Sequence, residues 1–171
     1  MDLRTFVREV PDFPKPGVSF KDITPLLSDA KAFADAVERM AEPVSTMQPT
    51  HVMGLESRGF IFGSALAQKM GLGFVPARKP GKLPLPIFSE SYGLEYGTDA
   101  LEIHQDSFKA GDRVLIVDDV LATGGTAAAA AGLVEKLGGE VVGLGFLMEL
   151  AFLDGRSRLP GRDITALLTY D

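Results

Sequence analysis

The sequence contains no cysteine and only two histidines, His51 and His104, among its 171 residues. Without cysteine the chain has no disulfide, no thiolate zinc site and no thiol nucleophile, and two histidines without clustered acids argue against a protein-held metal centre. Residues 1–10 carry charged side chains where a signal peptide needs an apolar core. No apolar run approaches the roughly 20 residues of a membrane span. We therefore expect a cytoplasmic protein that does not associate with membranes.

Positive charge is also scarce. The chain has 17 Lys and Arg against 23 Asp and Glu, a formal net charge of −6. Binding to nucleic acid needs a basic surface, so we expect no nucleic-acid partner, and any phosphate must be bound by a local group of residues. With 46% apolar and 23% charged residues, the chain suits one compact domain and is too short for a second.

Strand-like and helical segments alternate along the chain. Short strands are predicted at residues 51–55, 73–77, 101–104, 114–117, 140–147 and 164–168. Helices are predicted at about residues 29–41, capped by Ser28 and followed by Pro43, at residues 59–69, ended by Gly71, and from about Thr126. This alternation predicts an α/β fold with a largely parallel, twisted sheet flanked by helices.

Residues 78–99 interrupt this alternation with a stretch rich in proline, glycine and polar side chains. Loops of this length in a compact domain are usually functional. We predict a flexible lid over about residues 80–99 that closes over bound substrate.

The most informative motif is DDVLATGGT at residues 118–126, which follows the apolar run at residues 114–117. The apolar run predicts a buried strand, and the glycine-containing turn opens a helix. Gly124 and Gly125 allow backbone N–H groups to approach an anion, and the helix N-terminus favours negative charge. This order of elements predicts a phosphate-binding turn.

The two acids of this motif need a different ligand, because carboxylates repel phosphate. Asp118 and Asp119 suit a vicinal diol or a Mg²⁺ ion bound to one. A 5-phosphoribosyl group carries both a phosphate and a diol. The motif lacks the Gly-Lys-Ser/Thr ending of a P-loop and the Gly-x-Gly-x-x-Gly turn of dinucleotide-binding proteins.

Two basic segments follow predicted strands. Arg58 comes after the strand at residues 51–55, and Arg78, Lys79 and Lys82 come after the next one. Ligand sites in parallel sheets lie outside the carboxyl ends of the strands, so these cations should meet the acid pair there. Arginine forks and lysine point charges together suit pyrophosphate.

The motif at residues 118–126 resembles the signature of the type I phosphoribosyltransferases. Four further segments, in the same order along the chain, resemble the adenine-specific members of that family: FPKPGVSFKDITP at residues 13–25, GLESRGF at 54–60, RKPGKLP at 78–84 and SYGLEYG at 91–97. The resemblance covers most of the chain. It implies a single domain, residues 1–171, with a small base-binding hood at about residues 1–27.

The resemblance also implies an activity. The adenine-specific members of the family convert adenine and phosphoribosyl pyrophosphate to AMP and pyrophosphate in purine salvage, use Mg²⁺, and are usually cytoplasmic homodimers. Since the Mg²⁺ would be held mainly through substrate oxygens, we expect no direct protein cage for it.

The resemblance implies a binding role for each of these motifs. The 5-phosphate is bound by Ala122, Thr123, Gly124, Gly125 and Thr126, and the ribose hydroxyls are bound by Asp118 and Asp119.

The resemblance places Arg58, Arg78, Lys79 and Lys82 on or near the pyrophosphate; some of these cations can act from a second subunit, and Arg58 is also a catalytic residue. Phe20 and Val120 contact the faces of adenine, and backbone groups of Ser19 and Lys21 meet its edge.

Glu95 is the catalytic acid that the resemblance implies. It matches the family's lid residue that handles the proton on adenine N7, and a carboxylate suits this general acid/base work.

Two other classes of protein remain as alternatives. A receiver-like signalling domain also places acids at a strand end, but it would not explain the Thr-Gly-Gly-Thr turn or the basic segment at residues 78–82. A non-catalytic phosphoribosyl-binding regulator would keep the turn but would need a nucleic-acid surface, which this acidic chain lacks. Catalytic turnover separates both from the enzyme.

Overall fold

A computed structural model of the chain describes residues 1–84, 86–93 and 97–171. The chain divides into two compact units, Met1–Arg39 and Met40–Asp171. Among the described residues, no helix has both the length and the apolar character needed to cross a bilayer.

The first unit contains a short antiparallel hairpin and helical segments. Its elements are η1 (Leu3–Phe6), β1 (Arg8–Val10), β2 (Phe20–Asp22), α1 (Thr24–Ser28) and the first part of α2 (Ala30–Val44). The predicted cap Ser28 is wrong: Asp29 caps α2, because its carboxylate accepts hydrogen bonds from the N–H groups of Lys31 and Ala32 at 3.0 and 2.9 Å. Pro43 lies inside α2 rather than after it.

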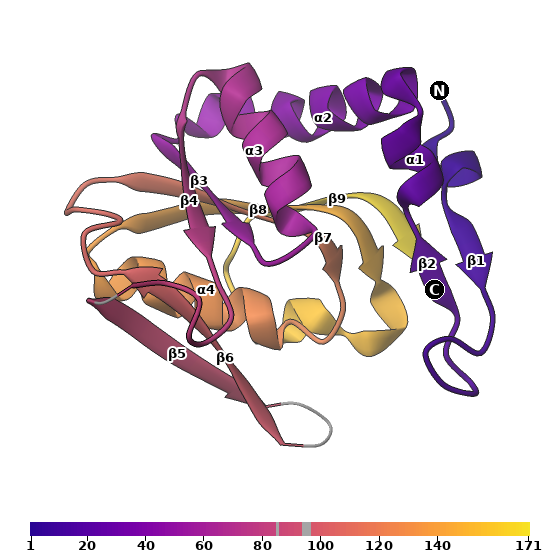
Figure 1. The fold of residues 1–171 in the computed structure, drawn as a ribbon. Coiled ribbons are helices and arrows are strands. Elements are labelled where there is room, and N and C mark those ends of the chain that lie inside the picture. The colour runs from indigo at the N-terminus through magenta and orange to yellow at the C-terminus, as the bar shows by residue number, and fades with distance from the viewer. Residues whose placement is uncertain (85, 94–96) are drawn as a thin grey trace. The chain divides into compact units, whose positions relative to one another are not determined.

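The second unit is built on a five-stranded parallel sheet with the strand order β4-β3-β7-β8-β9. Its strands are β3 (His51–Leu55), β4 (Gly73–Ala77), β7 (Arg113–Leu121), β8 (Glu140–Leu150) and β9 (Ile164–Tyr170). Helix α3 (Gly59–Met70) lies on one face of the sheet and α4 (Gly125–Lys136) on the other (Figure 1). The predicted parallel α/β architecture is therefore confirmed.

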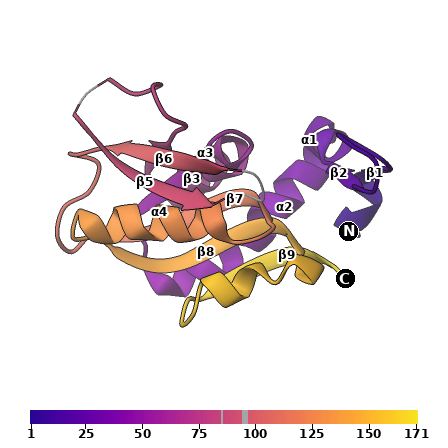
Figure 2. The ribbon, with the colours of Figure 1, turned by 90° about the horizontal axis from the view of Figure 1, so that it is seen from below.

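The predicted loop at residues 78–99 is partly wrong. Ile87–Gly93 forms strand β5, which pairs in antiparallel register with β6 (Thr98–His104), and this hairpin packs against α4 (Figure 2). The strand predicted at residues 101–104 therefore belongs to the hairpin and not to the parallel sheet. Proline and glycine are concentrated before β5, whereas the polar run of β5 itself has one side half-buried or buried, as a strand packed on a helix requires.

Strand β7 is longer than the apolar run that predicts it. It extends to Leu121, so Asp118 and Asp119 lie within the strand instead of after it. The backbone of both acids is therefore held by the sheet itself, and both side chains line one cleft.

Close backbone packing joins β3, α3 and β7. A Cβ atom on Gly59, the first residue of α3, would lie 2.8 Å from the carbonyl oxygen of Val117 and 2.9 Å from Oδ1 of Asp118. A Cβ atom on Gly54 in β3 would lie 2.9 Å from the carbonyl oxygen of Gly59. Only glycine allows the start of α3 to approach the end of β7 this closely.

We predict that Gly59→Ala lowers the free energy of unfolding by about 2 kcal/mol, because the added methyl overpacks this junction. The matched control is Gly132→Ala in α4, where the added Cβ would meet its nearest neighbour at 3.7 Å. The control should be neutral or stabilising by up to about 1 kcal/mol, because alanine favours helix. Urea unfolding of both variants measures the difference, and equal effects would contradict the packing argument.

Candidate active site

A cleft of about 370 Å³ opens at the carboxyl ends of the parallel strands. Its lining residues come from the segment after β3, the segment after β4, the end of β7 and the start of α4: Glu56, Ser57, Arg58, Lys79, Asp118, Asp119, Val120 and Thr126. The sheet therefore brings basic and acidic side chains from distant parts of the sequence to one edge, as predicted for a parallel sheet.

The turn between β7 and α4 forms a second, smaller hollow of about 60 Å³ next to the cleft. Ala122, Thr123, Gly124 and Thr126 are among its lining residues. Gly124 has a φ of 84°, a conformation that favours glycine, and α4 begins at Gly125. The helix N-terminus therefore presents unpaired N–H groups and a favourable dipole to an anion.

A segment near the C-terminus, which the sequence did not indicate as part of the site, packs against this turn. Element η4 (Gly155–Arg158) packs its backbone directly on the turn. A Cβ on Gly124 would collide with the carbonyl oxygen of Gly155, and a Cβ on Gly155 would collide with that of Ala122. The glycine in the DGR sequence at residues 154–156 was the available signal.

The acid pair at the end of β7 is held in place by hydrogen bonds. Asp119 is buried, and its carboxylate accepts a hydrogen bond from the guanidinium of Arg58. Oδ1 of Asp118 accepts the backbone N–H of Asp119 at 2.8 Å. Burial and the negative charge of Asp119 raise the pKa of Asp118 well above its ordinary value. Asp118 therefore binds a proton more readily than an exposed aspartate does.

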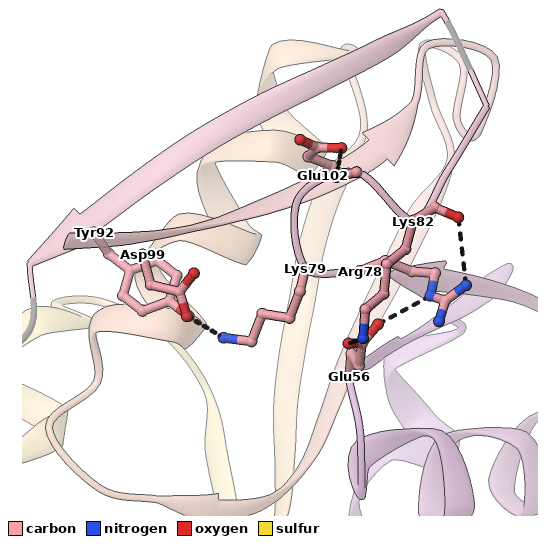
Figure 3. A network of polar contacts seen from close by, with 8 residues as sticks. Glu56, Arg78, Lys79, Lys82, Tyr92, Asp99 and Glu102 are labelled. Carbon is pink, nitrogen blue, oxygen red and sulfur yellow. Dashed lines mark hydrogen bonds and ion pairs between the residues drawn. The ribbon is translucent and has the colours of Figure 1, made fainter.

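Glu56 organises the basic segment after β4 (Figure 3). Its carboxylate, only 7% exposed, accepts a hydrogen bond from Nε of Arg78 at 2.9 Å and one from Nζ of Lys82 at 2.5 Å. Burial alone would raise the pKa of Glu56, but the bonds from Lys82 and Arg78, together with the backbone N–H of Lys79, hold that pKa below its ordinary value. One buried carboxylate thus fixes residues 78–82.

The same segment is tied to the hairpin by backbone hydrogen bonds. The N–H of Arg78 donates to the carbonyl oxygen of Glu102 at 2.9 Å, and the N–H of Glu102 donates back at 2.8 Å. The Glu102 carboxylate also accepts the N–H of Gly81 at 3.4 Å. The basic segment therefore lies between β3 and the hairpin.

Lys79 points away from Glu56 and toward the hairpin (Figure 3). Its ammonium donates to Oδ2 of Asp99 at 2.6 Å and to the hydroxyl of Tyr92 at 2.5 Å. Burial alone would lower the pKa of Lys79, but these two bonds raise it above its ordinary value. The bond from Lys79 and the N–H of Ala100 lower the pKa of Asp99. Both groups of this ion pair are therefore charged near neutral pH.

The first unit has a hollow of its own, of about 200 Å³, lined by Val10, Phe13, Phe20 and Asp22. The rings of Phe13 and Phe20 meet edge to face with their centroids 5.2 Å apart. Lys21 pairs with Glu9 at 2.7 Å and donates to the hydroxyl of Ser19 at 3.4 Å. Phe20 thus contributes to an apolar surface with polar groups beside it.

The structure brings most of the predicted residues of the second unit together. Arg58, Lys79, Asp118, Asp119, Val120 and Thr126 line the cleft, and Arg78 and Lys82 bind its lining residue Glu56. Ser19, Phe20 and Lys21 belong to the first unit. Glu95 lies outside the described residues. Sequence reasoning missed Glu56, Tyr92 and Asp99, although Glu56 lies within GLESRGF and Tyr92 within SYGLEYG.

Comparison with known proteins gives one consistent result. The sequence profile of the phosphoribosyl transferase domain matches residues 26–163. The adenine phosphoribosyltransferase of Gloeobacter violaceus is 57% identical over 171 residues, covering 99% of this chain and 100% of that protein. The Thermotoga maritima enzyme of the same name is 55% identical over 170 residues, covering 99% of this chain and 98% of that protein.

Solved structures agree with the sequence relatives. The crystal structure of adenine phosphoribosyltransferase from Thermoanaerobacter pseudethanolicus has a TM-score of 0.96 at 54% identity and covers 99% of this chain and 98% of its own. The Saccharomyces cerevisiae adenine phosphoribosyltransferase, complexed with an imino-altritol bisphosphate and adenine, has a TM-score of 0.91 at 42% identity and covers 98% of this chain and 97% of its own.

We predict that Asp118→Asn stabilises the fold at neutral pH. Because the folded pKa of Asp118 lies above its unfolded value, the stability that its proton contributes is present in acid and is lost as the pH rises through the folded pKa. Asparagine keeps the oxygen that accepts the Asp119 N–H and cannot ionise. Urea unfolding from about pH 4 to about pH 8 should show the variant gaining on the wild type as pH rises. Parallel curves would contradict the raised pKa.

Proposed function

The chain belongs to the adenine phosphoribosyltransferases, within the type I phosphoribosyltransferase family, and on that premise we propose how its cleft transfers the 5-phosphoribosyl group of phosphoribosyl pyrophosphate to adenine, giving AMP and pyrophosphate. The observation that carries the proposal is the meeting of three features at one sheet edge. These are the phosphate-binding turn before α4, the acid pair of β7 and the cations Arg58 and Lys79.

The turn at residues 122–126 binds the 5-phosphate. Its backbone N–H groups and the threonine hydroxyls donate to the phosphate oxygens, and the α4 dipole favours the charge. Asp118 and Asp119, near the carboxyl end of β7 just before this turn, accept hydrogen bonds from the ribose hydroxyls. Phosphate and sugar are thus held at fixed positions relative to the basic segment.

The four cations lie on or near the pyrophosphate. Arg58 and Lys79 line the cleft, and Arg78 and Lys82 stand beside it on Glu56. As the bond between C1′ and pyrophosphate breaks, C1′ gains positive charge and the leaving group gains negative charge. Cations fixed in place before the reaction stabilise that charge without having to reorganise. The hairpin and the residues near it, about 80–99, keep water from capturing the sugar.

Magnesium fits this site through the substrate. No group of three His, Cys, Asp or Glu side chains in the described part of the chain is placed to hold a metal ion. Of the three acids that line the cleft, Glu56 is paired with Arg78 and Lys82, which leaves the aspartate pair Asp118 and Asp119 as the candidate ligands. The oxygen atoms of Asp118 and Asp119 would suit Mg²⁺, whose other ligands would be substrate oxygens. An ion held there would supply positive charge that neutralises part of the pyrophosphate charge.

Adenine recognition and proton transfer follow the family resemblance. Phe20 and Val120 contact the faces of the purine, backbone groups of Ser19 and Lys21 meet its edge, and Glu95 handles the proton on N7 as N9 bonds to C1′. The aromatic surface of Phe13 and Phe20 within the first unit supports the role of Phe20. The resemblance further supports a cytoplasmic homodimer, in which some cations act from the second subunit.

We predict that adenine is the preferred base. A site that pairs with the amino group of adenine leaves buried polar groups unpaired when a 6-oxopurine enters, which costs several kcal/mol. The protein should be incubated with phosphoribosyl pyrophosphate, Mg²⁺ and, in turn, adenine, hypoxanthine, guanine, xanthine, uracil and orotate. Product formation with adenine alone supports the proposal. A kcat/KM for hypoxanthine or guanine comparable to that for adenine would refute the assignment.

We predict that Glu95→Gln lowers kcat on the order of 10²-fold while leaving phosphoribosyl pyrophosphate binding nearly unchanged, because glutamine cannot exchange the purine proton. Glu90→Gln is the matched control: it changes a carboxylate of β5 that pairs with Lys136 at 3.1 Å, outside the cleft. Single-turnover kinetics should show a slow Glu95 variant and a nearly normal control. If the Glu95 variant forms AMP at the wild-type rate, another group manages the proton.

A further inference from the structure

Lys79 joins the cleft to the hairpin. Lys79 lines the cleft, but its ammonium donates to the hydroxyl of Tyr92 at 2.5 Å and to the carboxylate of Asp99 at 2.6 Å (Figure 3). The hydroxyl of Tyr92 in turn donates to the same Asp99 oxygen at 3.2 Å. Two of the three donors of the ammonium are therefore used by residues that do not line the cleft.

Tyr92 and Asp99 stand directly opposite each other in the β5–β6 ladder, one position before the last pair, Gly93 and Thr98. The ring of Tyr92 is buried, and its Cδ2 atom lies 3.5 Å from where a Cβ on Gly125 would stand. The three polar side chains therefore connect the basic segment, the end of the hairpin and the start of α4.

The Lys79–Asp99 pair differs from the pairs made by Glu56. The difference lies in the acids, because the side chain of Glu56 is 7% exposed and that of Asp99 is 31% exposed. Their partners Arg78 and Lys79 are similarly exposed, at 34% and 33%. Water partly screens such a half-buried pair, which weakens the attraction between its charges. Pyrophosphate offers an ammonium several negative charges and short charge-assisted hydrogen bonds. Lys79, on a flexible stem, can therefore exchange Asp99 for pyrophosphate, while Glu56 keeps its partners.

We infer that Tyr92 and Asp99 are positioning residues that hold Lys79 in the substrate-free protein, and that pyrophosphate binds by taking the Lys79 ammonium from them. The inference rests on the proposed function, since it takes pyrophosphate as the ligand of the cleft. The exchange leaves Asp99 and the Tyr92 hydroxyl without their cation. Pyrophosphate binding thereby breaks the side-chain contacts of Lys79 with Tyr92 and Asp99, which join the basic segment to the end of the hairpin.

The exchange predicts that removing either competitor tightens binding. Calorimetry with inorganic pyrophosphate and Mg²⁺ should give a Kd that is roughly two- to five-fold lower for Tyr92→Phe and for Asp99→Asn than for the wild type. Tyr92→Phe keeps the buried ring and changes no charge, so it isolates the hydroxyl. Glu90→Gln, which removes an exposed ion pair elsewhere on the same hairpin, should leave the Kd unchanged.

The Lys79→Met background separates exchange from simple electrostatics. Without the ammonium there is nothing to release, so adding Tyr92→Phe or Asp99→Asn should no longer change the Kd. If Asp99→Asn still tightens binding there, the effect comes from removing a negative charge near the cleft, and the inference is wrong. It is also wrong if either single variant weakens binding, because Tyr92 and Asp99 would then hold Lys79 in its binding position.

The outcome for the wild type distinguishes the inference from the proposed function. A wild type that binds pyrophosphate, with Tyr92→Phe and Asp99→Asn unchanged from it, overturns the inference and leaves the proposed function intact. A wild type that does not bind pyrophosphate overturns both. Thermal unfolding of each variant confirms that the conservative replacements keep the fold.

Discussion

The cleft depends on the contact between the start of α3 and the end of β7, where only a glycine fits. Gly59 brings the backbone of α3 against Val117 and Asp118, and this approach sets Arg58 beside Asp119. The hydrogen bond between those side chains is thus a consequence of backbone packing. Gly124 and Gly155 allow a second close backbone contact, in which η4 packs against the phosphate-binding turn after β7.

Charge balance is the second constraint on the site. Each cation assigned to pyrophosphate is already paired with a carboxylate: Arg58 with Asp119, Lys79 with Asp99, and Arg78 and Lys82 with Glu56. A chain with a net charge of −6 can therefore hold a local group of cations without leaving any of these four unpaired. Ligand binding at such a site exchanges partners, so its strength depends on how firmly each acid keeps its cation.

The sequence predicts the parallel sheet well because each strand is a short apolar run ended by turn residues. Residues 51–55 and 73–77 match β3 and β4, and Gly71 ends α3 in the left-handed conformation that its position suggests. It does not predict the hairpin, because the polar residues of β5 become a strand only by pairing with β6 and packing on α4. Ser28 failed as a cap because Asp29 lies next to it and competes for the same N–H groups.

In the candidate site, too, local motifs could be predicted from the sequence and contacts between distant residues could not. The turn and the acid pair are contiguous in the sequence and could be predicted together, whereas Glu56 acts on residues 22 and 26 positions away and Asp99 on one 20 positions away. Such pairings have no local signal. Burial then decides what each pairing does: the enclosed Glu56 fixes the basic segment, because separating its partners would leave a buried charge. The side chain of Asp99 is 31% exposed, so water screens its bond to Lys79 more than it screens Glu56, and a ligand can compete for the lysine.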